Sequence, residues 1–165
     1  MEPRHGLLRN QIRQAFGGES GIPPGMNEFL TLINGAYFQF ESRQTDFLRQ
    51  VIDLNPHFVF AKDRNGRFTL VNKAVADAYG TSVEKLLGKS DADFNPNAEE
   101  VEHFRQDDLA VIDGGEVKDI PCEKITDAGG NVRWLWTIKR PIPSPDGRDT
   151  HVLGVATDIT LRLQA

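Results

Sequence analysis

The residue types that do chemistry in proteins are present in this sequence, but their spacing does not form a catalytic or metal-binding motif. His5, His57 and His151 have no metal-ligand spacing relative to one another. Acidic neighbours such as Glu99 and Glu100 diverge around a helix and do not converge on one point. No Ser/His/Asp set, phosphate-binding glycine loop or phosphoacceptor histidine motif is recognisable. The sequence therefore predicts neither an enzyme nor a metal site.

The composition is that of an ordinary folding chain with a slight excess of negative charge. The 165 residues include 19 Lys+Arg and 24 Asp+Glu, which gives a net charge of -5. A hydrophobic content of 39% is enough for the core of one domain. The acidic balance argues against nucleic acid as a partner. With 1 cysteine, no signal-like N-terminus and no apolar run of about 20 residues, we expect a cytoplasmic segment without a membrane span.

The first third of the chain has helical patterning interrupted by a turn-rich stretch at 17–25 (GGESGIPPG). A short apolar stripe at 7–16 precedes that stretch. After it, apolar residues recur at heptad spacing, and Gln44 takes one of the heptad positions. The apolar residues are Leu30, Ile33, Tyr37, Phe40, Phe47, Val51 and Leu54. Two interpretations compete: an amphipathic helix that packs on the domain core, or a dimerising coiled coil whose register Gln44 sets.

The rest of the chain alternates between strand and helix patterns. Two strands joined by an Asn-Gly turn come first, three helical segments follow, and three strands with turn-rich loops close the sequence. The strands are predicted at 57–62, 68–72, 117–126, 132–142 and 150–159, and the helices at 73–79, 81–87 and 98–112. Thr81 and Glu84 have the spacing of a capping box for the second helix. Because the helices fall between the second and third strands, we predict an α+β fold with helices on one face of a five-stranded antiparallel sheet.

Several short motifs recur here in the order and spacing of one family. They are IDLNP at 52–56, KDRNGRFTLVNKA at 62–74, YG at 79–80, LGK at 87–89, VIDGG at 111–115, Trp134, Pro141, DG at 146–147, GV at 154–155 and DIT at 158–160. Together they resemble a PAS domain over 47–160. The preceding helical run resembles the segment that often leads into PAS domains of bacterial sensor histidine kinases.

The resemblance implies a division of the chain and a role for each part. Residues 1–46 would be a helical region and candidate dimerisation segment, 47–160 the PAS domain, and 161–165 the start of a truncated signalling linker. The family implies a sensory or dimerising module without catalysis, and the DIT ending usually leads to an effector. We therefore expect a homodimeric fragment of a longer signalling protein, with a C-terminal effector such as a histidine kinase; a stand-alone adaptor is the alternative.

The resemblance also assigns faces to the strands. It directs one set of side chains toward the helices and a small-molecule pocket; these are Phe60, Phe94, Ile125, Leu135, Thr137, Lys139 and Ala156. Trp134 and Trp136 then lie on the outer face, where two indoles left in water mark an interface. We expect that interface to include Leu30, Ile33, Tyr37 and Phe40. In the alternative, the parity is reversed and the tryptophans belong to the core.

An inward-facing Lys139 needs a partner, because an isolated buried ammonium is costly. The resemblance places Asp91 and Asp93 close enough, and of these two we predict that Asp93 forms an ion pair with Lys139 at the pocket. The alternative is that Lys139 extends its ammonium to solvent along an apolar stem.

Cofactor assignments are mostly negative. Flavin photosensors of this family carry a reactive cysteine on a helix, whereas Cys122 lies in a predicted strand. Haem-binding members of the family carry their axial histidine on the long helix, and His103 lies on that helix. Phe104, however, occupies the axial-ligand position, and His103 is one residue away from it. One residue along a helix turns the side chain by about 100°. Haem and a flavin adduct are thus disfavoured and the cofactor is unassigned. Alternatively, Phe58, Phe60, Phe94 and Ile125 fill the interior and leave an interaction module without a ligand.

Overall fold

The structure is a computed structural model that describes residues 26–165. The chain divides between Gln50 and Val51 into two compact units. Helix α2, Met26–Leu54, forms all of the first unit's described part and runs without interruption. The apolar stripe predicted at 7–16 lies outside the described residues. Between residues 26 and 165, no helix is both long and apolar enough to cross a membrane.

Helix α2 leaves its heptad side chains open to solvent. Tyr37, Phe40 and Phe47 are 44%, 60% and 63% exposed, and Ile33, Val51 and Leu54 are exposed as well. We call these six residues the α2 seam. The side chain of Leu30 lies outside the described part. Exposed apolar stripes of this kind are common at protein association surfaces.

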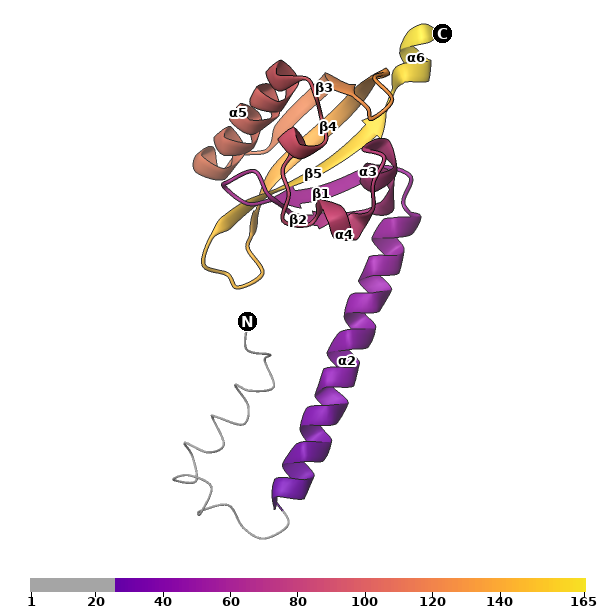
Figure 1. Cartoon of the computed structure of the whole chain (residues 1–165). Helices are drawn as coiled ribbons and strands as arrows, with labels where there is room; N and C mark the ends of the chain where they lie inside the picture. Colours follow the sequence, from indigo (N-terminus) through magenta and orange to yellow (C-terminus); the bar gives the residue numbers. More distant parts are fainter. Residues whose placement is uncertain (1–25) are drawn as a thin grey trace. The chain divides into compact units, whose positions relative to one another are not determined.

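The second unit contains a five-stranded antiparallel sheet in the order β2-β1-β5-β4-β3. Its strands are β1 Phe58–Lys62, β2 Phe68–Val71, β3 Lys118–Thr126, β4 Val132–Pro143 and β5 Thr150–Asp158. The first and last strands thus meet in the centre of the sheet (Figure 1). The architecture confirms the predicted α+β fold with five antiparallel strands.

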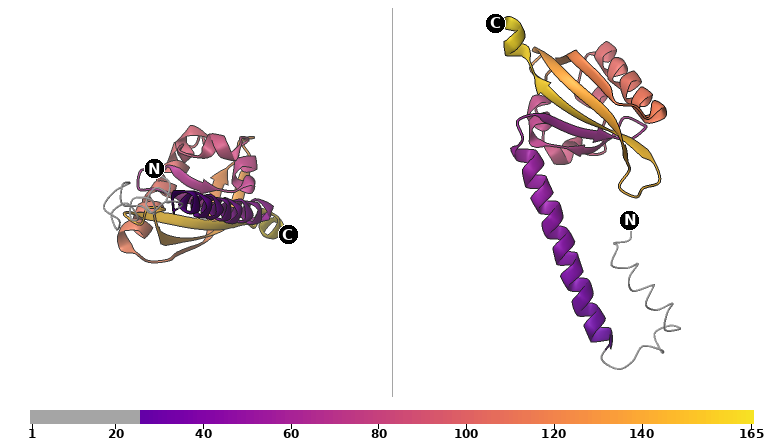
Figure 2. Two further views of the ribbon diagram at one scale, coloured as in Figure 1. Left: turned by 90° about the horizontal axis from the view of Figure 1, so that it is seen from below. Right: turned by 180° about the vertical axis from the view of Figure 1, so that it is seen from behind.

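The helices between β2 and β3 gather on one face of this sheet. They are α3 Lys73–Ala78, α4 Val83–Leu86, the short 3-10 helix η2 Asp91–Asp93 and α5 Ala98–Gly114. Helix α3 contacts β1, α4 contacts β2, and α5 contacts β3, β4 and β5. Seen from behind, the strands lie in front of these helices (Figure 2). A short helix α6, Thr160–Gln164, follows β5.

One buried asparagine organises the start of the second unit. Asn72 follows β2, is fully buried, and caps α3 by accepting a hydrogen bond from the Val75 amide. Its Oδ1 also accepts from the Val59 amide at 3.1 Å, and its Nδ2 donates to the carbonyls of Ile52 and His57 at 2.8 and 2.7 Å. One side chain therefore satisfies backbone groups of three different segments.

The predicted capping box at Thr81 and Glu84 is wrong. The Thr81 amide donates to the Ala76 carbonyl and closes α3, after Gly80 turns the chain in the left-handed region at φ 64°. Helix α4 therefore starts later, with Ser82 as its N-cap residue and no side-chain cap hydrogen bond. The capping box of this region lies instead at Ser90 and Asp93, around η2.

Beneath the helices the sheet packs closely around one glycine. Gly154 of β5 lies opposite Phe60 of β1. A Cβ atom at position 154 would lie 2.2 Å from Cζ of the Phe60 ring, closer than any real contact. The absence of a side chain at 154 is therefore what lets the Phe60 ring lie across the sheet.

Candidate functional site

A cavity of about 50 Å³ lies between the helices and the sheet. We call it the central cavity. Five of the predicted pocket residues line it: Phe60, Ile125, Leu135, Lys139 and Ala156. The other two do not. Thr137 is fully buried and donates a hydrogen bond to Glu123, and Phe94 stacks on Tyr79 with ring centroids 6.0 Å apart.

The cavity also has polar walls that were not among the predicted pocket residues. Lys62, Tyr79, Asp91 and Glu123 line it along with the apolar side chains. Strand alternation contains a signal for Lys62, because positions 58, 60 and 62 of β1 share one face and the first two are phenylalanines. Asp91 is one of the two aspartates that the resemblance places near Lys139. Glu123 carries no such signal, because its position depends on a bulge in β3.

Two lysines and two aspartates form a buried charged network at one end of the cavity. Lys62 Nζ lies 2.5 Å from Asp91 Oδ2 and 2.9 Å from Asp108 Oδ2, and Lys139 Nζ lies 2.7 Å from Asp108 Oδ1. The Tyr79 hydroxyl donates to Asp91 at 2.7 Å. All five side chains are buried. Each charge thus has an opposite partner within direct contact, which is the condition for burying it.

The partner of Lys139 is Asp108, so the predicted Asp93–Lys139 pair is wrong. The Asp93 carboxylate accepts hydrogen bonds from the Ser90 amide and hydroxyl at 2.9 and 3.2 Å, and Asp93 is exposed. Within one 3-10 turn, residues two positions apart point in different directions, so Asp91 faces the cavity while Asp93 does not. Asp108 reaches Lys139 because it lies one helical turn after Phe104, on the sheet-facing side of α5.

Opposite charges outweigh burial in this network. Burial acts to raise the pKa of Asp108, but the ammonium groups of Lys62 and Lys139 bring it below the ordinary value of 3.8. Burial acts to lower the pKa of Lys62, but Asp91 and Asp108 raise it above the ordinary value of 10.5. The Lys62 ammonium also lies 5.0 Å from the centroid of the Phe60 ring and 5.3 Å from that of Phe68. Asp108 and Lys62 are therefore both ionised at neutral pH.

Glu123 borders the network and is only partly satisfied. Thr137 donates to its Oε1 at 3.0 Å, while Oε2 is buried with no hydrogen-bond partner among the described residues. Burial raises the pKa of Glu123 above its ordinary value, even though Lys139 acts in the opposite direction. The cavity thus offers a small polar molecule both ammonium groups and a carboxyl group to bind.

The opposite face of the sheet carries the two tryptophans. Leu135, Thr137 and Lys139 of β4 are buried beneath the helices, whereas Trp136 and Ile138 are exposed. Trp134 is half-buried, and the Trp136 indole donates to Asp119 at 2.7 Å. An interface role for Trp134 and Trp136 stays a prediction.

Neither His103 nor Cys122 lines the central cavity. His103 is exposed on α5, with Nε2 3.3 Å from Asp107 Oδ2, and Phe104 is the residue of that pair that points inward. Cys122 is exposed on β3. Neither side chain therefore offers a ligand or nucleophile to a molecule bound in this cavity.

The family of the chain follows from comparison with known proteins. A family model described as PAS fold matches residues 52–164. The chain belongs to the PAS family. The PAS domain of BvgS from Bordetella pertussis superposes with a TM-score of 0.58 at 25% identity, covering 74% of this chain and 90% of that domain. This PAS domain is thus a sensory module of the kind found in signalling proteins, and not a catalytic domain.

Two curated relatives show which longer proteins contain a similar segment. The methanogenesis regulatory histidine kinase FilI of Methanothrix harundinacea is 29% identical over 143 residues, covering 84% of this chain and 15% of that protein. A diguanylate cyclase of Vibrio cholerae is 26% identical over 162 residues, covering 93% of this chain and 45% of that protein. The chain therefore spans less than half the length of either relative.

Proposed function

We propose that this PAS domain senses a small molecule in the central cavity and passes its state to a C-terminal effector of a longer signalling protein. In this proposal residues 1–46 dimerise two copies, 47–160 bind the ligand, and 161–165 begin the linker to the effector. We favour a histidine kinase as the effector, because FilI is one, with a diguanylate cyclase as the alternative. Such a signalling module would work in the cytoplasm.

The observation that carries the proposal is the charged network in the cavity wall. A small carboxylate could take the place of Asp91 at Lys62, where the distance between the two side chains is 2.5 Å. Such a ligand would bind more tightly to a packing in which the loop bearing Asp91 is released from Lys62. That difference in affinity between the two packings is what would let the ligand shift the equilibrium between them. The cavity of about 50 Å³ suits a molecule of few heavy atoms, since pockets for larger ligands measure about 300–1,000 Å³.

The junction after β5 supplies a route out of the sheet. The Ile159 amide donates to the Trp134 carbonyl at 2.8 Å, and the Trp134 amide donates to Thr160 Oγ1 at 2.9 Å. The Thr160 amide in turn donates to Asp158 at 2.9 Å, at the start of α6. A shift of β4 would therefore move the first turn of α6, and with it any segment attached there.

The test is a thermal-shift experiment with formate, acetate, malonate and glycine as probes. We expect at least one carboxylate to raise the melting temperature by several degrees at about 100 times its dissociation constant, because it binds only the folded state. Gly154→Ala should abolish that shift, because the new Cβ displaces the Phe60 ring, which lines the cavity.

Gly114→Ala is the matched control, since a Cβ there meets no atom within 4 Å. It should retain the full ligand-induced shift. A shift of equal size in the Gly154→Ala protein would contradict binding in the central cavity.

A second candidate function is a ligand-free interaction module, which the small volume of the cavity favours. In that case no probe changes the melting temperature of the wild-type protein. Dimerisation through α2 would then be the function that remains.

A further inference from the structure

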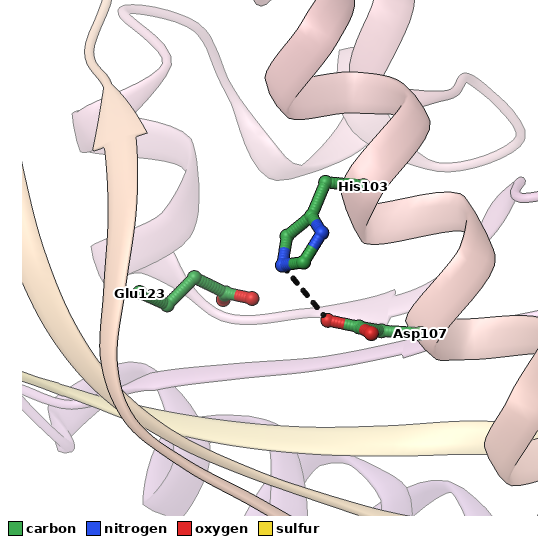
Figure 3. A group of neighbouring side chains, drawn as sticks. All are labelled: His103, Asp107 and Glu123. Atoms are coloured by element: carbon green, nitrogen blue, oxygen red, sulfur yellow. Dashed lines mark ion pairs between the residues drawn. The ribbon is translucent and has the colours of Figure 1, made fainter.

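A second cluster of chemically active side chains lies outside the central cavity, between α5 and β3. His103 and Asp107 are one helical turn apart on α5, and Glu123 faces them from β3 (Figure 3). One potential ligand atom from each of the three lies within 4.8 Å of the other two. The sequence predicted no metal site, because nothing in the spacing of His103 and Asp107 points to a residue of a later strand.

Two oxygens of this cluster have no hydrogen-bond partner among the described residues. They are Asp107 Oδ2 and Glu123 Oε2, on side chains of residues only 4% and 6% exposed. A buried carboxylate oxygen without a hydrogen-bond donor is unfavourable, so native structures rarely leave two of them close together. A cation bound between them would satisfy both.

The other oxygen of each carboxylate already contacts a neighbouring side chain. Asp107 Oδ2 and Glu123 Oε2 therefore point at a common space. Asp107 Oδ1 forms an ion pair with Lys118, and Glu123 Oε1 accepts from Thr137. Asp107 Oδ2 forms an ion pair with His103 Nε2 at 3.3 Å, and the dashed line in Figure 3 marks this contact. Lys139 and Lys62 also act on Glu123, and both already pair with Asp108.

We propose that His103 Nε2, Asp107 Oδ2 and Glu123 Oε2 bind a divalent transition-metal ion, for which Zn²⁺ is the best fit. One imidazole and two carboxylates form a borderline donor set that suits Zn²⁺ better than Ca²⁺ or Mg²⁺, which prefer oxygen alone. Zinc bonds of about 2.0–2.1 Å place tetrahedral ligand atoms about 3.4 Å apart. The His103–Asp107 edge already has that length, so only the Glu123 carboxylate has to approach.

The site opens to solvent through an acidic groove. The groove is lined by Glu99, Glu102, His103 and Glu123, with Lys124 as its one lysine. Negative charge along a groove raises the local concentration of cations and speeds their entry. Water from the groove would complete the coordination, because only three protein ligands are available.

Glu123 lines both this groove and the central cavity. A bound metal ion would hold its carboxylate on the groove side and so change the charge that faces the cavity. The proposed metal site stands independently of whether the cavity binds a carboxylate.

The test is isothermal titration of the whole chain, after chelator treatment, with ZnCl₂, and in parallel with CoCl₂ followed by visible absorption. We expect one saturable site and Co²⁺ absorption bands of a four- or five-coordinate ion. His103→Ala should weaken Zn²⁺ binding at least 10-fold and remove the Co²⁺ bands. His103 is exposed, so its loss should leave the fold intact.

Glu123→Gln is the second variant, because it keeps the shape of the side chain and removes its charge; circular dichroism checks its fold. It should also weaken binding at least 10-fold. Glu102→Gln, in the same groove but outside the cluster, and His57→Ala, an exposed histidine elsewhere, should bind as the wild-type protein does. The proposal would be overturned if the wild-type protein showed no saturable Zn²⁺ site. It would also be overturned if the His103→Ala or the Glu123→Gln protein bound Zn²⁺ as tightly as the wild-type protein does.

Discussion

At the scale of single residues, Asp108 is the pivot of the interior. Among the described residues, it is the one carboxylate that contacts both Lys62 and Lys139, at 2.9 and 2.7 Å. Buried ion pairs contribute little net stability compared with apolar packing, but removing one partner leaves a buried charge without compensation. Asp108 is therefore expected to matter more for stability than any exposed charge in the chain.

Replacing Asp108 with Asn tests this expectation. The change keeps the volume and removes the charge that serves two buried ammonium groups, so we expect a loss of about 3–5 kcal/mol in the free energy of unfolding, measured by urea denaturation. Asp113→Asn is the matched control, because Asp113 pairs with Arg64 on the exposed surface. It should leave the urea midpoint unchanged; equal losses in both variants would show that burial of the charge is not the cause.

The contribution of Glu123 to the stability of the fold changes with pH in the opposite direction to that of Asp108. Burial raises its pKa in the folded state above the ordinary 4.5, so the folded protein holds this proton more tightly than the unfolded chain does. Its contribution to stability is present below the unfolded pKa and is lost as pH rises through the raised folded pKa.

We therefore expect Glu123→Gln to be more stable than the wild-type protein at neutral pH, with the difference vanishing on acidification toward about pH 4. Urea titrations at a series of pH values between about pH 4 and pH 8, with chelator present, measure it. The stabilising contribution of Asp108 should disappear only at lower pH, because its pKa is lowered. A constant difference between the two proteins across the series would mean that Glu123 does not titrate in that range.

At the scale of elements, Asn72 connects the segments that frame the central cavity. Its side chain caps α3 and bonds the backbone of β1 and of the chain around Ile52. Val75, Ala78 and Tyr79, which α3 and its C-cap supply to the cavity wall, depend on where that helix begins. The cap therefore positions the cavity as well as the helix.

Asn72→Ala should cost about 3 kcal/mol or more, from a lost helix cap and from buried backbone groups left without partners. Thermal or urea unfolding measures the loss. Asn65→Ala, in the exposed turn between β1 and β2, should change stability by less than about 0.5 kcal/mol. An Asn72→Ala protein as stable as the Asn65→Ala protein would show that water replaces the lost hydrogen bonds at little cost.

At the scale of the whole molecule, the α2 seam is the surface through which we expect two chains to dimerise. Its six members are all exposed within one chain, although heptad spacing is the pattern with which helices pair. Gln44 at one of the heptad positions fits a helix whose register is set by a polar residue. We therefore expect dimers held by this helix.

Phe40→Glu tests the dimer, because a charge at the centre of a coiled-coil seam must be buried on association. We expect the dissociation constant of the dimer to rise at least about 100-fold, which corresponds to about 2.7 kcal/mol. Sedimentation or light scattering over a dilution series measures it. Gln39→Glu places the same charge on the adjacent exposed position and should dimerise as the wild-type protein does. A wild-type protein that stays monomeric at all concentrations tested would contradict dimerisation through the α2 seam.

Local patterns along the chain were enough to predict the elements and the class of fold. Period-two alternation in β4 and β5, the Asn-Gly turn after β1 and the glycines that end helices are properties of neighbouring residues. The observed bounds agree within one or two residues for the last three strands. The family resemblance, and not the alternation alone, directs Lys139 inward, where the structure buries it.

Which groups meet across the interior was decided only by the tertiary structure. Asp108 instead of Asp93 reaches Lys139 because the rotation and docking of α5 on the sheet bring residues 31 positions apart into contact. His103 and Asp107 likewise meet Glu123 only because β3 returns beside α5. Pairing energies of buried charges depend on distances of a few ångströms, and sequence patterns specify a face of an element but not its position over another.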